Sequence, residues 1–139
     1  MFRQATTIKR RDEIYNIIVL SKKVADEIYS LSKIYYENNE EHIGFISSEI
    51  RSNFVLLNNY IKLLEKRGIE TNISKYVINY KKAIMGGHFE TTDFKNQLLI
   101  PNQRAEISHG RSELNYRIDK MYIDWSGKIG FINQFYKLK

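Results

Sequence analysis

Histidine and the acidic residues are the side chains of this sequence best suited to metal binding and acid–base chemistry. The histidines are His42, His88 and His109, and none has the HExxH or His-x3-His spacing that places two ligands on one helix face. His88 precedes Glu90 and Asp93, so these three side chains could form an oxygen-rich metal site. So loose a cluster is more typical of an exposed polar loop, and we expect no metal site.

Other catalytic patterns are incomplete. His109 and Glu113 stand four residues apart on one helix face, which is more typical of a solvated contact than of a catalytic dyad. The pair Gly86-Gly87 lacks the GxxxxGK[ST] pattern and follows a predicted helix, whereas a phosphate-binding loop follows a strand. The absence of cysteine excludes disulfides, thiolate zinc sites and cysteine nucleophiles. We therefore predict a protein that is not an enzyme and needs no metal or cofactor.

The composition favours long helices in one domain. With one proline and seven glycines in 139 residues, the chain lacks the frequent turn signals of an all-β domain. This length suits a single domain, residues 1–139, with one core. The first residues become charged before any apolar stretch appears, which predicts no signal peptide. The longest aliphatic run, residues 17–20, is far too short to cross a membrane, and we expect a cytoplasmic protein.

Two long helices are predicted in the first half of the chain, because apolar residues recur there at steps of three and four. The first helix is predicted from about Thr7, whose hydroxyl would cap the first turn, to Glu37. The second begins at Ile43 and closes on Lys66-Arg67-Gly68. Basic side chains followed by glycine favour a helix end with a left-handed C-cap.

The second half of the chain is more interrupted. A shorter third helix is predicted from Ser74, which would supply its N-cap, to the stop or kink at residues 86–87. The last helix is predicted from about Gln103 to Tyr136. In the irregular stretch between them, Thr92 or Asp93 could cap a short helix before Pro101 forces a turn. We predict that residues 86–102 are mobile or face a partner.

Amphipathic helices joined by short connections favour an up-down bundle. The predicted fold is all-α, an antiparallel up-down four-helix bundle with long first, second and fourth helices and a broken third helix. In this order, one pole of the bundle combines the start of the first helix, the end of the second, the start of the third and the end of the fourth.

Basic residues are concentrated in the segments that meet at this pole. The predicted nucleic-acid-binding residues are Lys9, Arg10, Arg11, Lys62, Lys66, Arg67, Lys75, Lys81, Lys82, Lys128 and Lys137. The chain has a formal net charge of +6, and a concentrated cationic surface neutralises several phosphates at once. Tyr76, Tyr80 and Tyr136 lie near these cations and could stack on bases. The alternative is that the lysines form the ordinary solvated faces of helices. The opposite pole is predicted to be acidic.

A segment of the last helix resembles a known family motif. Residues 118–125, with the sequence IDKMYIDW, resemble the closing motif of the four-helix-bundle family of the accessory variability protein (Avd) of diversity-generating retroelements and of proteins encoded in 23S rRNA intervening sequences. The matching residues are Ile118, Lys120, Met121 and Trp125, whereas Asp119, Ile123 and Asp124 replace glycine or small residues of the family pattern. The resemblance implies a homo-oligomer, typically a pentamer, in which Ile118, Met121 and Trp125 pack the bundle or the subunits.

The sequence therefore predicts a basic accessory protein that binds nucleic acid. The resemblance implies that the partners are RNA and a reverse transcriptase, or a similar nucleic-acid enzyme. Two alternatives remain open at this point. The chain could be a protein-binding scaffold or inhibitor from a phage or mobile element, or a small helical subunit of a ribonucleoprotein effector.

Overall fold

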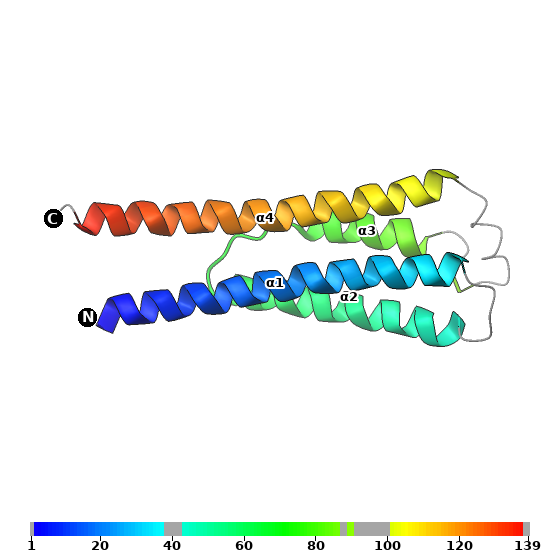
Figure 1. Ribbon diagram of the computed structural model, residues 1–139, viewed down its shortest axis with the longest axis horizontal. Coiled ribbons are helices and arrows are strands. Elements are labelled where there is room, and N and C mark those ends of the chain that lie inside the picture. Colours follow the sequence, from blue (N-terminus) through cyan, green and yellow to red (C-terminus); the bar gives the residue numbers. More distant parts are fainter. Residues whose placement is uncertain (1, 38–42, 87–88, 91–100, 138–139) are drawn as a thin grey trace.

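The structure is a bundle of four α-helices with no strand among its described residues (Figure 1). This computed structural model describes residues 2–37, 43–86, 89–90 and 101–137, and in these ranges it describes side chains from residue 9 to residue 127, apart from 43 and 101. The helices are α1 (Phe2–Glu37), α2 (Ile43–Lys66), α3 (Ser74–Met85) and α4 (Pro101–Lys137). The prediction of an all-α four-helix bundle is confirmed.

Successive helices run in opposite directions along the bundle (Figure 1). Ion pairs show that α1 and α4 are also antiparallel, since Lys22 pairs with Asp119 at 2.9 Å and Asp26 pairs with Arg111 at 3.1 Å. A step forward along α1 is therefore a step backward along α4. α1 packs against both α2 and α4, and α3 packs against α4. Figure 1 also shows that α1 and α4 both continue past the connection between α2 and α3.

The predicted helix ends are partly wrong. α1 begins at Phe2, so Thr7 lies inside the helix and is not its cap. Ser74 is the first residue of α3, where the N-cap position is Ile73 and no side chain caps the helix. Pro101 is the first residue of α4, because its fixed φ suits a first turn in which its missing N–H is not needed. The short helix considered at Thr92 or Asp93 lies outside the described residues.

The core combines apolar residues from every helix with buried tyrosines. The fully buried side chains include Ile14, Ile28, Tyr35, Phe54, Leu57, Tyr80, Ile84, Leu114 and Ile118. The Phe54 and Tyr80 rings meet edge to face, with their centroids 5.7 Å apart, so α2 and α3 also share this core. These contacts connect the four amphipathic faces into a single hydrophobic unit.

Buried tyrosine hydroxyls join α1 to α3 and the residues that follow it. The Tyr80 hydroxyl donates to the Ala25 carbonyl at 2.9 Å, and the Tyr36 hydroxyl donates to the Ile84 carbonyl. The Tyr35 hydroxyl accepts a hydrogen bond from the Glu90 amide at 2.8 Å. Burial raises the pKa of Tyr36 to about 12 and raises the pKa values of Tyr35 and Tyr80, so the three phenols stay neutral at ordinary pH.

A glycine allows α3 and α4 to approach closely. A Cβ atom at Gly110 would lie 3.2 Å from Cδ1 of Tyr80 and 3.3 Å from its Cα. Because Tyr80 is fully buried and bonded to Ala25, its ring cannot move aside freely. A Cβ atom at Gly127, on the same helix, would have no heavy atom of another described element within 4 Å, so this glycine provides a matched comparison.

We predict opposite effects for alanine at these two glycines. Gly127→Ala should raise the free energy of unfolding by about 0.5–1 kcal/mol, because alanine is the better helix former in an open position. Gly110→Ala should show no such gain and should lower stability, because its methyl group collides with Tyr80. Chemical denaturation of both variants measures the difference, and an equal gain in both would show that the α3–α4 contact is not tight.

A second prediction concerns the Tyr80 hydroxyl. Tyr80→Phe should lower the free energy of unfolding by about 1 kcal/mol, the usual net value of one hydrogen bond. Tyr116→Phe should have no effect, since that side chain is 57% exposed. The raised pKa of Tyr80 also implies that stability is fully present below its ordinary pKa of 10.0 and falls as the pH rises above it. Urea titrations at neutral and alkaline pH should give a shallower fall for Tyr80→Phe, and an identical fall would contradict the assignment.

Candidate nucleic-acid interface

The connection between α2 and α3 is fixed at its start by a helix-ending motif. Gly68 has a φ of 84°, which confirms the predicted left-handed C-cap. The Gly68 amide donates to the Glu65 carbonyl at 3.0 Å, and the Ile69 amide donates to the Leu64 carbonyl at 3.1 Å. This is the Schellman pattern, and Ile69 and Leu64 are both buried, as its accompanying hydrophobic contact requires. The motif anchors residues 67–73 at one end of the bundle.

Basic side chains from α1 and α2 meet at this connection. The Arg10 guanidinium donates to the Arg67 carbonyl at 2.6 Å, and Arg67 forms an ion pair with Glu13. The Arg11 side chain is half-buried, and its Nε has no hydrogen-bond partner in the described part of the chain. The exposed cations around them are Lys9, Lys62, Lys66 and Lys75. The structure thus brings most of the predicted basic residues to one end.

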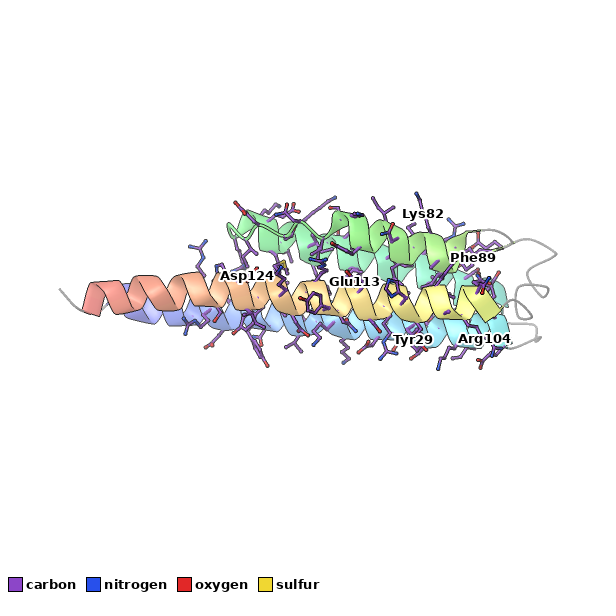
Figure 2. All side chains as sticks on the ribbon, turned by 90° about the horizontal axis from the view of Figure 1, so that it is seen from above. Tyr29, Lys82, Phe89, Arg104, Glu113 and Asp124 are labelled. Carbon is purple, nitrogen blue, oxygen red and sulfur yellow. The ribbon has the colours of Figure 1, made fainter. Side chains whose placement is uncertain are left out.

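A hollow of about 480 Å³ lies between this connection and α4. One wall is formed by residues 68–73, and the other includes Arg117, Lys120 and Asp124 of α4. The Arg117 guanidinium lies over the Tyr76 ring, 4.5 Å from its centroid. Figure 2 shows Asp124 on the part of α4 near this connection. The hollow combines aromatic surface with two cations and two carboxylates, Glu70 and Asp124. Its rings suit flat bases, while attraction for an anionic chain has to come from the lysines of the same end.

Aromatic and hydrogen-bonding groups complete the hollow. Trp125 and Tyr76 are partly buried and line it from α4 and α3. Thr71 and Asn72 line it from the connection, where Asn72 has a φ of 48° and Thr71 donates to Glu65 at 2.9 Å. The left-handed conformation of Asn72 is one that asparagine tolerates better than most residues. Hydrogen-bonding groups of the connection therefore lie beside the aromatic side chains of the hollow.

Arg117 and Lys120 are basic residues of this end that the sequence pattern did not indicate. The sequence of α4 identifies only its buried apolar face and the lysines near its end as notable. A residue at the edge of the buried face looks like ordinary surface. The sequence feature that could have indicated this contact is Tyr76, near the start of α3. An antiparallel α4 must place one of its residues beside that ring. Only the α3–α4 contact shows that this residue is Arg117.

One pair of the predicted basic residues does not join this interface, and the prediction for a second pair is not tested. Lys81 and Lys82 lie near the end of α3, and Figure 2 shows Lys82 toward the same end of the bundle as Phe89. The prediction assigned all of α3 to one pole, but two helical turns carry these lysines well away from Ser74. Lys128 and Lys137 belong to the last turns of α4, and their side chains lie outside the described residues.

The predicted acidic pole is tested only in part, because Glu40, Glu41 and Asp93 lie outside the described residues. Its described acidic residues are Glu37, Glu49, Glu90 and Glu106, and its described basic residues are Lys33, Arg51, Lys81, Lys82 and Arg104. Arg51 forms an ion pair with Glu90, and this hydrogen bond is the main cause that lowers the pKa of Glu90. Charge among the described residues of that end is therefore mixed.

Two of the candidate metal-binding and catalytic carboxylates form ion pairs with arginines. Glu90 pairs with Arg51, while His88 and Asp93 lie outside the described residues. Glu113 accepts a hydrogen bond from Arg117 at 3.3 Å. Glu106 and His109 have the Glu-x-x-His spacing of di-metal bundles, but both are exposed instead of pointing into the core. No group of three or more potential metal ligands occurs in the part of the chain that the structure describes.

The residues of the family-like motif pack the bundle. Ile118 is fully buried, Met121 is 6% exposed, and Trp125 packs partly buried against the core. The Trp125 ring lies 6.2 Å from the Tyr122 ring, which in turn lies 5.5 Å from the Tyr15 ring of α1. Trp125 therefore packs against the core between α1 and α4 and also lines the hollow.

Comparison with known proteins adds no relative. No protein-family model, curated protein or solved structure matches the chain. None of the described helices is long and apolar enough to span a membrane.

Proposed function

We propose that this protein is a non-enzymatic cytoplasmic accessory protein that binds single-stranded nucleic acid, RNA in preference, at its basic end. The observation that carries the proposal is the hollow beside residues 67–73, where Tyr76 and Trp125 stand with Arg117 and Lys120. Exposed lysines of α1, α2 and α3 lie at the same end of the bundle, and neutralising phosphates with such cations releases counterions.

The lysines and the aromatic rings of this surface would contact different parts of a nucleic acid. Lys62, Lys66 and Lys75 would follow the phosphates, since they are exposed and form no ion pair among the described residues. The rings of Tyr76 and Trp125 would receive a base, and stacking on aromatic side chains contributes about 1–3 kcal/mol per base. A paired base in a duplex cannot enter the hollow, so the geometry favours single strands.

The proposed protein partner is a reverse transcriptase or a similar nucleic-acid enzyme. This part of the proposal rests on the resemblance of residues 118–125 to the retroelement accessory family. The alternatives are a protein-binding scaffold or inhibitor of a phage or mobile element, and a small subunit of a ribonucleoprotein effector. The outer face of α2 is the feature that favours protein contacts.

The nucleic-acid proposal predicts a localised salt-dependent affinity. Lys62→Gln combined with Lys66→Gln should weaken binding of a short single-stranded RNA and reduce the slope of log affinity against log salt by about 1.4, the value for two lost phosphate contacts. The control combines Lys81→Gln with Lys82→Gln, which removes the same charge from the far end of α3. Fluorescence anisotropy across a salt series measures both effects.

The hollow has its own test in the same assay. Trp125→Leu keeps an apolar side chain on the core but removes the stacking surface, so it should weaken single-stranded RNA and leave any weak duplex binding unchanged. If both lysine pairs weaken RNA binding equally, binding depends on the overall charge of the protein and not on the basic end. A wild-type protein that binds no RNA at low salt would contradict the proposal.

We also propose that the chain assembles with copies of itself through the outer face of α2. Residues 52–61 of this helix include no charged residue, although much of its surface is exposed. Phe45, Leu56 and Leu63 are 67%, 37% and 40% exposed and recur on the face opposite the core. In a two-fold contact each residue near the axis meets its own copy, so an uncharged face avoids repulsion between like charges. The neighbouring Asn58 and Asn59 amides can pair with their own copies, because an amide both donates and accepts.

Assembly predicts a molar mass that is a multiple of the 16.5 kDa chain mass. Leu56→Lys combined with Leu63→Lys should give a monomer, because two charges would be buried in the contact. Ile123→Lys is the matched control on α4, where Ile123 is 64% exposed. Light scattering measures each mass and distinguishes a dimer from the pentamer implied by the family resemblance. A monomeric wild type would contradict this proposal and leave the RNA proposal standing.

A further inference from the structure

A second cavity, of about 380 Å³, lies between the last turns of α1 and the first turns of α4. It is at the opposite end of the bundle from the basic interface and shares no residue with the hollow described above. Figure 2 labels Tyr29 and Arg104 along one edge of the bundle at this end. Nothing in the proposed nucleic-acid function uses this cavity.

Its walls are rings and aliphatic side chains. Tyr36 and Ile107 are buried and line it, and Tyr29 is half-buried beside them. The Tyr36 hydroxyl is already bonded to the Ile84 carbonyl, so its ring is the part that can face a ligand. Apolar and aromatic walls with a few polar groups are typical of small-molecule sites, and this volume is near the lower end of their range.

The charges around the cavity are not balanced. Lys33 lies over the Tyr29 ring, 4.8 Å from its centroid, and forms no ion pair within the described chain. Arg104 also lacks a partner among the described residues and lies in the first turns of α4, where the helix dipole adds positive potential. Glu37 is the one carboxylate among the described lining residues. Within that described lining, two cations therefore face one carboxylate beside an aromatic wall.

Arg111 also contacts the Tyr29 ring, and unlike Lys33 it has a carboxylate partner among the described residues. Its guanidinium lies 4.3 Å from the centroid of Tyr29, and it also forms an ion pair with Asp26 at 3.1 Å. Two cations thus lie over the Tyr29 ring, and only Arg111 of the two has a carboxylate partner among the described residues. This contact fixes the ring as one wall of the cavity and leaves Lys33 for a ligand.

We propose that this cavity binds a small organic anion with a flat aromatic body. The anionic group would lie between Lys33 and Arg104, where charge-assisted hydrogen bonds are the strongest available. The ring would pack against Tyr36 and Ile107. A purely inorganic anion would leave the apolar walls in contact with water, and an uncharged ring would leave both cations unpaired.

The test uses anilinonaphthalene sulfonate, a fluorescent aromatic anion, with the full chain. The wild type should bind one molecule per chain, and Arg104→Gln or Lys33→Gln should each weaken binding about tenfold, as expected for one lost charged contact. Ala105→Trp should abolish binding by filling the cavity from an exposed position of α4. Lys23→Gln, on an exposed position of α1, is the matched control and should not change the affinity.

Two further probes separate this site from general adhesion of dye to apolar surface. Inorganic phosphate and the uncharged anilinonaphthalene should both compete poorly with the sulfonate. If the uncharged compound competes equally, or if Arg104→Gln, Lys33→Gln and Ala105→Trp all bind like the wild type, the proposal is wrong. If Lys62→Gln combined with Lys66→Gln removes the binding instead, the anion binds at the basic end and this cavity is not its site. Circular dichroism confirms that each variant retains its helices.

Discussion

The arrangement of the bundle depends on how α3 is held against α1. An isolated helix of 12 residues is marginal in water, so the position of α3 has to come from tertiary contacts. The Tyr80 hydroxyl bonds to α1 near the middle of that helix, and the Tyr36 hydroxyl bonds to a carbonyl in the last turn of α3. These bonds set the height and rotation of α3. They thereby place Tyr76 beside Arg117, and without that placement α4 and the α2–α3 connection would not enclose a hollow.

The sequence was sufficient for the helices because their burial is periodic. Ile14, Ile28, Leu57 and Leu114 lie on faces that any helical spacing of apolar residues reveals, and all four are fully buried. Helix ends were less predictable, because Ser74 and Pro101 each suit either a cap or a first helical turn. The Gly68 cap was predictable because its signals agree: cations before it, glycine at the turn, and an apolar residue after it.

The candidate sites were harder to predict because they form where separate helices meet. Lys81 and Lys82 were assigned to the basic end by their element, whereas the position along α3 decides where each side chain lies. Exposed ion pairs add a second difficulty, since Arg67 counts as a free cation in the sequence but pairs with Glu13. Such pairs contribute only about 0–1 kcal/mol, so a phosphate can compete with Glu13 for Arg67. The basic end is therefore more cationic toward a polyanion than its ion pairs suggest.

The close contact of Gly110 with Tyr80 also constrains how sequences with this fold can change. A smaller residue at position 80 would relieve the contact with the ring but not the 3.3 Å contact with the Cα atom, and it would remove the hydrogen bond to Ala25. Position 110 should therefore accept only glycine while α3 and α4 keep this separation. Related sequences, once aligned with this one, are expected to keep glycine at position 110, while position 127 varies.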